Sequence, residues 1–209
     1  MKNVFYVGVV VLFLLSGLNT GFAQEEPFRK HEIGLDVSGL FGAGTGKLFY
    51  RNHTENNAFR VSLSLGGRFM TNTDEGLSGN ASQSFSSSLA LGYQWNRPFD
   101  KWAFYYGSDA VLGYQSNSYV TPSESREVNY RGYGLSGGLQ PFVGLSYSFS
   151  EAVSLSVETA LNISWIYNES KTRVHEFSSG INRPLPTFTE RGLSFFYRPV
   201  SLLMISYHF

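Results

Sequence analysis

The chain has 209 residues, with 16 basic and 16 acidic side chains and no net charge. This balance gives no indication of nucleic acid or of any strongly charged partner. The absence of cysteine excludes a disulfide framework, a thiol nucleophile and cysteine-ligated metal sites. A slightly negative mean hydropathy argues against an ordinary helical membrane protein.

The first 23 residues differ from the rest of the chain. Lys2 gives a positive start, Val4–Leu15 is almost unbroken apolar sequence, and small residues precede a cut after Ala23. This is the pattern of a cleaved secretory signal peptide. The alternative is a membrane anchor, but the apolar run is shorter than the roughly 20 residues a spanning helix needs. We therefore expect a signal peptide over 1–23 and one exported domain over 24–209.

Apolar and polar residues alternate with a period of two along most of the exported domain, which predicts β-strands. Most runs reach the roughly 10 residues that a tilted strand needs to cross a bilayer. There are eight runs, in chain order His31–Gly42, Lys47–Arg51, Ala58–Met70, Ser84–Trp95, Trp102–Tyr114, Gly132–Phe149, Val153–Tyr167 and Phe195–Phe209.

The linkers between the runs alternate in length, which predicts short turns on one rim and long polar loops on the other. The short linkers are Asn52–Asn57, Asn96–Lys101 and Ser150–Ala152. The long linkers are Met70–Gln83, Gln115–Arg131 and Asn168–Gly192.

The composition of the two strand faces predicts which face meets water. The polar faces carry mostly Ser, Gly, Ala, Asn and Gln, whereas a water-facing surface is expected to be charged at about a quarter of its positions. The apolar faces end in aromatic residues, which is typical of the two interfaces of a membrane. These are Trp95, Trp102, Tyr147 and Phe149 on the short-turn side, and Phe69, Tyr114, Tyr133, Trp165 and Tyr167 on the long-loop side. The alternative is a soluble β-domain with its apolar face inside.

Three segments carry a resemblance to a known family. The ending SLLMISYHF, with KWAFYYGSDAVLGY and AFRVSLSLGGRF, is similar to small OmpA/OmpX-like outer-membrane proteins of Gram-negative bacteria. The resemblance implies an all-β fold, an eight-stranded antiparallel up-and-down transmembrane β-barrel in the cell outer membrane. One departure from the family is expected, since the likeness extends to the barrel only and not to the peptidoglycan-binding domain of full-length OmpA proteins. It also implies a C-terminal signal read by the barrel-assembly machinery, formed by Leu203, Ile205, Tyr207 and Phe209.

Charged residues on the polar faces predict a salt-bridged plug inside the barrel, because buried charges must be paired. The period-two alternation, or parity, of each strand places certain charged residues on its inward side. The inward acidic residues are Asp36, Asp109 and Glu158, at mid-height, and the inward basic residues are Arg60, Arg68 and Arg198. The alternative is a narrow charged path for ions or protons. Eight strands leave an interior barely wide enough for side chains, which favours the plug. Pro141 and Pro199 fit poorly inside strands and require a bulge or a later strand start.

The chemistry-bearing motifs are weak. The segment Phe41–Lys47 lacks the first glycine and the Ser/Thr of a phosphate loop. The four histidines do not have the spacing of metal ligands. The chain also lacks the His-x-Ser pair that outer-membrane deacylases of similar barrel size use. We therefore expect a protein that is not an enzyme and that binds neither a cofactor nor a metal ion. The leading hypothesis is a structural or adhesion-like surface protein that contacts outer-membrane lipid, lipopolysaccharide and an unidentified extracellular ligand, and no nucleic acid. A porin-like channel for small solutes or ions and a lipid-modifying enzyme stay open as alternatives.

Overall fold

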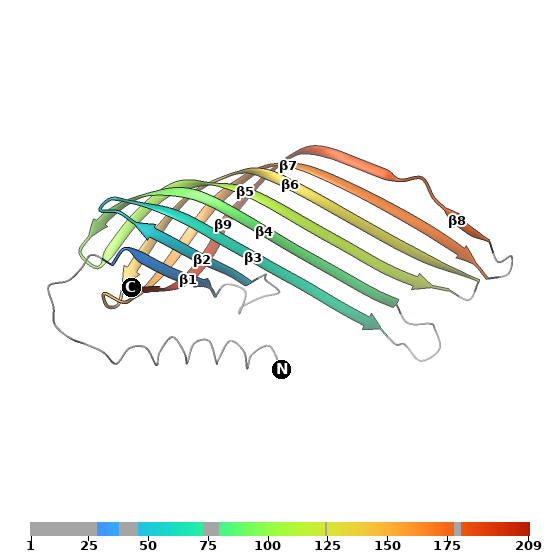
Figure 1. Ribbon diagram of the computed structural model, residues 1–209, viewed down its shortest axis with the longest axis horizontal. Helices are drawn as coiled ribbons and strands as arrows, with labels where there is room; N and C mark the ends of the chain where they lie inside the picture. Colours follow the sequence, from blue (N-terminus) through green and yellow to red (C-terminus); the bar gives the residue numbers. More distant parts are fainter. Residues whose placement is uncertain (1–28, 38–45, 73–79, 124, 178–180) are drawn as a thin grey trace.

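The computed structural model describes residues 29–37, 46–72, 80–123, 125–177 and 181–209, so the expected signal peptide at 1–23 lies outside it (Figure 1). None of these ranges contains a helix of the length and apolarity needed to cross a membrane. The described chain is all-β. Its strands are β1 His31–Asp36, β2 Gly46–His53, β3 Asn57–Asn72, β4 Asn80–Phe99, β5 Trp102–Pro122, β6 Arg126–Ser148, β7 Val153–Glu176, β8 Asn182–Pro184 and β9 Phe188–His208.

Eight of these strands form a closed antiparallel ring. Each of β1 to β7 pairs with the next strand in sequence, β7 also pairs with β9, and β9 returns to pair with β1. The three-residue β8 pairs with β7 outside this ring. The ring order confirms the expected antiparallel arrangement of eight strands, with neighbours in sequence lying side by side in space (Figure 1).

One end of the ring carries the short turns. The β2–β3 turn spans 54–56, the β4–β5 turn is Asp100–Lys101, and the β6–β7 turn spans 149–152. Asp100 adopts φ 55°, a left-handed conformation that Asp tolerates better than most residues and that two-residue hairpins require. The C-terminus lies at this end, where Phe209 exchanges backbone hydrogen bonds with His31. The expectation of short turns on one rim is therefore confirmed.

The opposite end differs from the expected long loops. The described residues of Gln115–Arg131 and Asn168–Gly192 are largely strand, and residues 70–72 and 80–83 belong to β3 and β4, because the hairpins continue to pair well beyond the apolar runs. The β5–β6 hairpin, for example, stays paired to Pro122 and Glu127, and the rings of Tyr119 and Tyr130 stack across it at 4.5 Å. The polar composition of these segments reflects their exposure to solvent and not the absence of strands. Cross-strand pairs still stabilise the strands here.

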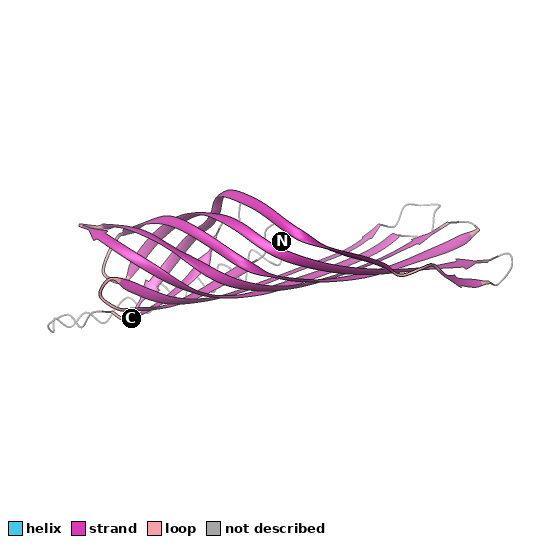
Figure 2. Ribbon diagram, turned by 90° about the horizontal axis from the view of Figure 1, so that it is seen from above, coloured by secondary structure: helices cyan, strands magenta, loops and turns pink. Residues whose placement is uncertain are grey.

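The long strands project beyond the closed part of the ring as an open sheet (Figure 2). Pairing of β2 with β3 ends at Leu65, and pairing of β1 with β9 ends at Met204. Past these points, among the described residues, β3 pairs with β4 alone and β9 with β7 alone. The ring therefore encloses an interior near the short turns, and its concave face opens toward the far end.

Both prolines that fitted poorly lie where strand pairing is interrupted. Pro141 falls in a gap of the β6–β7 ladder. Pro199 lies at a bulge in β9. The two β7 residues on either side of Thr159 are two positions apart, whereas their partners on β9 are four positions apart. The hydroxyl of Thr159 donates a hydrogen bond to the backbone oxygen of Arg198 at 2.9 Å. The hydroxyl of Ser201 donates one to the backbone oxygen of Glu158 at 3.0 Å. Side chains thus replace the missing ladder hydrogen bonds, and the expected bulge is confirmed at Pro199.

The ring has its polar residues inside and its apolar residues outside. On the inner face Arg60 and Glu158 are each 1% exposed, whereas Leu112 and Leu65 on the outer face are 67% and 52% exposed. The inner face also buries two small apolar clusters, Phe49 with Leu202 and Met204, and Tyr105 with Phe142 and Ala160.

Candidate functional site

The interior of the closed ring is organised around the Arg60 guanidinium of β3. Its Nη1 lies 2.8 Å from Oε2 of Glu158 on β7, and its Nη2 lies 3.3 Å from Oε1. Its Nε lies 3.1 Å from Oδ1 of Asp109 on β5, with the geometry of an ion pair rather than of an aligned hydrogen bond. The guanidinium also stacks 3.9 Å from the ring centre of Phe142 on β6, and Nη1 donates to Gln94 on β4 at 3.5 Å. Side chains from four other strands thus meet at this cation of β3.

A second ion pair lies closer to the short turns. Nη1 of Arg51 on β2 lies 3.0 Å from Oε1 of Glu32 on β1, and both side chains are almost fully buried. The Arg51 guanidinium lies 5.1 Å from the ring centre of Tyr105, which links this pair to the apolar residues around Arg60. The Lys47 ammonium lies 4.6 Å above the Phe49 ring on the same inner face of β2. We call Glu32, Arg51, Arg60, Asp109 and Glu158 the interior cluster.

Four of the six residues predicted for the plug lie on the enclosed inner face. The structure brings Arg60, Asp109 and Glu158 into direct contact. Asp36 is half-buried, and its Oδ1 lies 3.4 Å from the backbone nitrogen of Leu203 on β9. Parity along the strands was therefore a sufficient guide wherever the ring is closed.

The prediction that Arg68 and Arg198 lie in the interior is wrong. Both are exposed, although each is on the inward side of its strand. Arg68 lies beyond Leu65, where β2 stops pairing, and Arg198 lies beyond Met204, where β1 stops pairing. At their level the inner face is open, and the Arg198 guanidinium instead lies 5.5 Å from the ring centre of Phe196.

Sequence reasoning missed Glu32 and Arg51. The signal was present, because Glu32 shares the parity of Asp36 along β1. Arg51 also alternates with the outward Leu48 and Tyr50 on β2. The run on β2 is short, so its alternation alone is a weak signal for which side chains point inward.

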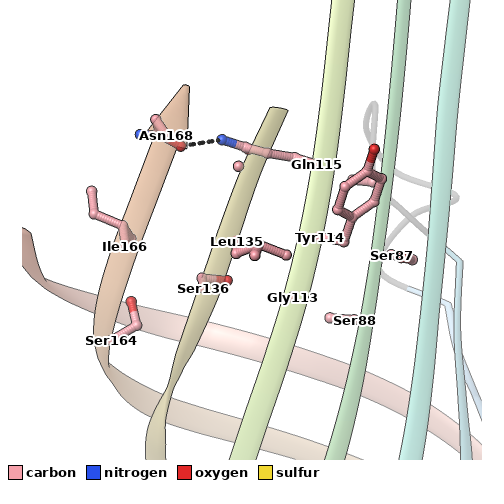
Figure 3. Close-up of a pocket in the computed structure, with 12 residues that line it drawn as sticks. Ser87, Ser88, Gly113, Tyr114, Gln115, Leu135, Ser136, Ser164, Ile166 and Asn168 are labelled. Atoms are coloured by element: carbon pink, nitrogen blue, oxygen red, sulfur yellow. Dashed lines mark hydrogen bonds between the residues drawn. The ribbon is translucent and has the colours of Figure 1, made fainter. Parts of the chain in front are cut away.

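Above the interior cluster the inner wall forms a polar recess of about 300 Å³ (Figure 3). Its lining is built from small neutral side chains on β4 to β7, among them Ser86, Ser88, Ser136 and Ser164. In the close-up, Gln115 reaches toward Asn168, and its Nε2 donates to Oδ1 at 3.2 Å. The small residues leave the open half of the ring hollow, whereas the interior cluster fills the closed half.

Three potential metal ligands meet at the short-turn rim. Glu32, His53 and His208 each place one ligand atom within 4.8 Å of the others. Nε2 of His53 lies 2.6 Å from Oε2 of Glu32, and Nε2 of His208 lies 2.9 Å from the hydroxyl oxygen of Ser154. The spacing of the four histidines along the chain shows no metal-binding pattern. The structure shows two of the four beside a carboxylate.

No protein-family model matches the chain, and no curated protein matches it either. The ring combines an apolar outer face, a charged interior cluster that solvent does not reach, and a polar sheet that extends past the closed part.

Proposed function

We propose that the chain is a non-enzymatic outer-membrane protein, an eight-stranded up-and-down transmembrane β-barrel with a closed lumen. The observation that carries this proposal is the inside-out distribution of polarity, with ion pairs buried within the ring and large apolar side chains on its outer face. In water such a surface would be an aggregation hazard, whereas in lipid it is the surface that a barrel needs. The resemblance to OmpA/OmpX-like proteins supports the same conclusion.

Two aromatic bands on the outer face support membrane insertion. On the short-turn side the rings of Trp102 and Tyr147 lie 4.7 Å apart, and Trp95 stacks on Tyr106 at 5.6 Å. On the other side Tyr114 contacts Phe85, and Tyr133 contacts Tyr167. Trp102 and Tyr114 are separated by about 30 Å along the barrel axis for a strand tilted by about 40°, which matches the hydrocarbon core of a bilayer.

The closed lumen favours a structural role over a channel. Arg60, Asp109 and Glu158 are each 1% exposed, so the described side chains leave no water-filled path at their level. The barrel should therefore give no steady current in planar bilayers. A steady current from the unmodified protein would support the channel alternative instead.

The strands extend past the second aromatic band and supply the surface for a partner outside the cell. On the outer face of β6 and β7 a cavity of about 410 Å³ carries several cationic side chains. Its lining residues are Glu127, Asn129, Arg131, Lys171, Arg173, His175 and Asn182. Arginine and lysine clusters recognise phosphate, so the phosphate groups of lipopolysaccharide are the ligand that this cavity fits best.

One carboxylate links the cavity to the second aromatic band, because it contacts residues of both. Glu169, which lies beyond the band, accepts hydrogen bonds from Tyr133 at 2.5 Å and Tyr167 at 3.0 Å, and its Oε1 lies 2.9 Å from Nζ of Lys171. The hydrogen bonds from Tyr133, Lys171 and Tyr167 lower the pKa of Glu169 to about 2, so the carboxylate stays ionised. It holds Lys171 at the edge of the band, where a lipid phosphate would lie.

Gel migration and cell fractionation test the proposal directly. Unboiled protein in detergent should migrate differently from boiled protein, because closed barrels resist unfolding, and the mature protein should fractionate with the outer membrane. Recovery of folded protein in the soluble periplasm would contradict the proposal.

Vesicle binding tests the ligand cavity. Lys171→Ala combined with Arg131→Ala should weaken binding to vesicles that contain lipopolysaccharide, whereas Arg198→Ala should not. Equal binding by both variants would show that this cavity is not the contact.

A further inference from the structure

We infer that Glu32, His53 and His208 form a binding site for one zinc ion at the short-turn rim. Each ligand comes from a different strand, Glu32 from β1, His53 from β2 and His208 from β9, and these three strands are neighbours. Glu32 lies directly opposite His208 across one pair of strands and opposite Arg51 across the other. His53 lies two residues beyond Arg51 on the same face of β2, which places it diagonally across from Glu32.

The donor atoms suit zinc better than a hard cation. Two imidazole nitrogens and one carboxylate oxygen are ligands that zinc uses, whereas Mg²⁺ and Ca²⁺ prefer all-oxygen sites. Tetrahedral zinc with bonds of 2.0–2.2 Å separates its ligand atoms by roughly 3.3–3.5 Å. The three ligand atoms lie within 4.8 Å of one another, and the closest pair, from His53 and Glu32, is 2.6 Å apart. Small rotations of side chains would therefore bring all three to zinc.

The surroundings orient the ligands as metal sites require. Arg51 pairs with Oε1 of Glu32 and leaves Oε2, the oxygen that faces His53, for the metal. The hydroxyl of Ser154 contacts the ring of His208 and fixes its orientation, a role that outer partners commonly take in metal sites. Glu32 is buried, whereas His53 and His208 are half-buried, so an ion can enter from the rim. Three protein ligands leave a fourth position for water.

The site spans the seam where the last strand of the ring meets the first. His208 is the final residue of β9, and Glu32 is the second residue of β1. A metal ion bound there would hold these two strands and β2 together. Zinc would therefore act as a clamp on ring closure and raise the thermal stability of the folded protein.

Calorimetric titration tests the site. Folded protein purified in detergent and stripped with a chelator should bind one Zn²⁺ per chain, and zinc should raise its melting temperature. His53→Gln and His208→Gln should each lower the affinity by about tenfold or more, since each removes a ligand. The matched controls are His31→Gln, on the outer side of β1 against Tyr50, and His175→Gln, at the far end of β7. Both should bind zinc as the unmodified protein does.

Folding of each variant is checked by its migration on a gel without boiling, and His53→Gln leaves the buried Glu32–Arg51 pair in place. Failure of the unmodified folded protein to bind zinc at millimolar concentration would overturn the inference. Equal affinity in His53→Gln and in the His31→Gln control would also overturn it, and would leave Glu32 and His53 as a simple ion-pair network with Arg51. These outcomes do not depend on whether the barrel lies in a membrane.

Discussion

Arg60 and Glu158 form a two-point ion pair across the ring, with distances of 2.8 and 3.3 Å between guanidinium nitrogens and carboxylate oxygens. Their strands lie on opposite sides. Between β3 and β7 the ring contains β4, β5 and β6 in one direction, and β9, β1 and β2 in the other. The pair therefore closes the lumen and ties its two walls together.

Removing one partner of this pair should be costly. Glu158→Ala leaves Arg60 buried with Asp109 as its remaining carboxylate contact, so we expect a loss of about 3–5 kcal/mol in the free energy of unfolding. Denaturant unfolding in detergent, followed by tryptophan fluorescence, measures it. Arg198→Ala, at an exposed position, is the control and should change stability by less than about 0.5 kcal/mol. Similar losses in the two variants would contradict the assignment of Arg60 as the partner of Glu158.

The close approach of β4 to the interior cluster makes a second prediction. A Cβ added at Gly92 would clash with Oδ1 of Asp109 and would lie 2.7 Å from the backbone oxygen of Ser108. Gly92→Ala should therefore displace Asp109 from Arg60 and destabilise the fold by about 1–3 kcal/mol. Gly137→Ala is the matched control within a strand, because its nearest new contact would be an ordinary 3.4 Å to Leu112. If the control were destabilised as much as Gly92→Ala, the loss would come from the strand backbone and not from the cluster.

The sequence predicted the closed half of the ring better than the open half. Where all eight strands pair, alternation alone placed Arg60, Asp109 and Glu158 on the inside and Leu203, Ile205 and Tyr207 on the outside. Alternation is a property of each strand, so it carries no information about where neighbouring strands stop. That is why strand ends such as Pro122 were placed in loops.

Two features of the interior depend on contacts between strands distant in sequence. Arg68 and Arg198 keep inward parity, but their burial depends on whether β1 and β2 reach them. His53 and His208 are far apart along the chain, and their approach follows from the closure of β9 onto β1 and from the position of Glu32 between them. A pattern within one strand does not report such long-range register.

The C-terminal residue offers a test of assembly. Phe209 is half exposed, and its backbone exchanges two hydrogen bonds with His31, so its loss should remove only a few kcal/mol of interactions. The resemblance to OmpA/OmpX-like proteins implies that the assembly machinery recognises the outward series ending at this residue. On that hypothesis, deletion of Phe209 should leave refolding in detergent intact but block assembly in cells. Lys30→Ala, outside the strands at the same rim, is the control and should leave assembly unchanged, because the backbone oxygen of residue 30 still accepts from His53. Normal assembly after loss of Phe209 would argue against that recognition.

Quenching of the native tryptophans by brominated lipids tests the central claim, that the apolar outer face contacts a bilayer. The chain has three tryptophans, and Trp95, Trp102 and Trp165 are all exposed on the outer face, the first two near one rim and the third near the opposite band. In vesicles their fluorescence should be quenched strongly by lipids brominated near the headgroups, and less by lipids brominated at the chain ends, because the proposed insertion puts both bands at the interfaces. Fluorescence that brominated lipids leave unquenched, in protein that is folded and bound to the vesicles, would contradict insertion of the ring into the membrane.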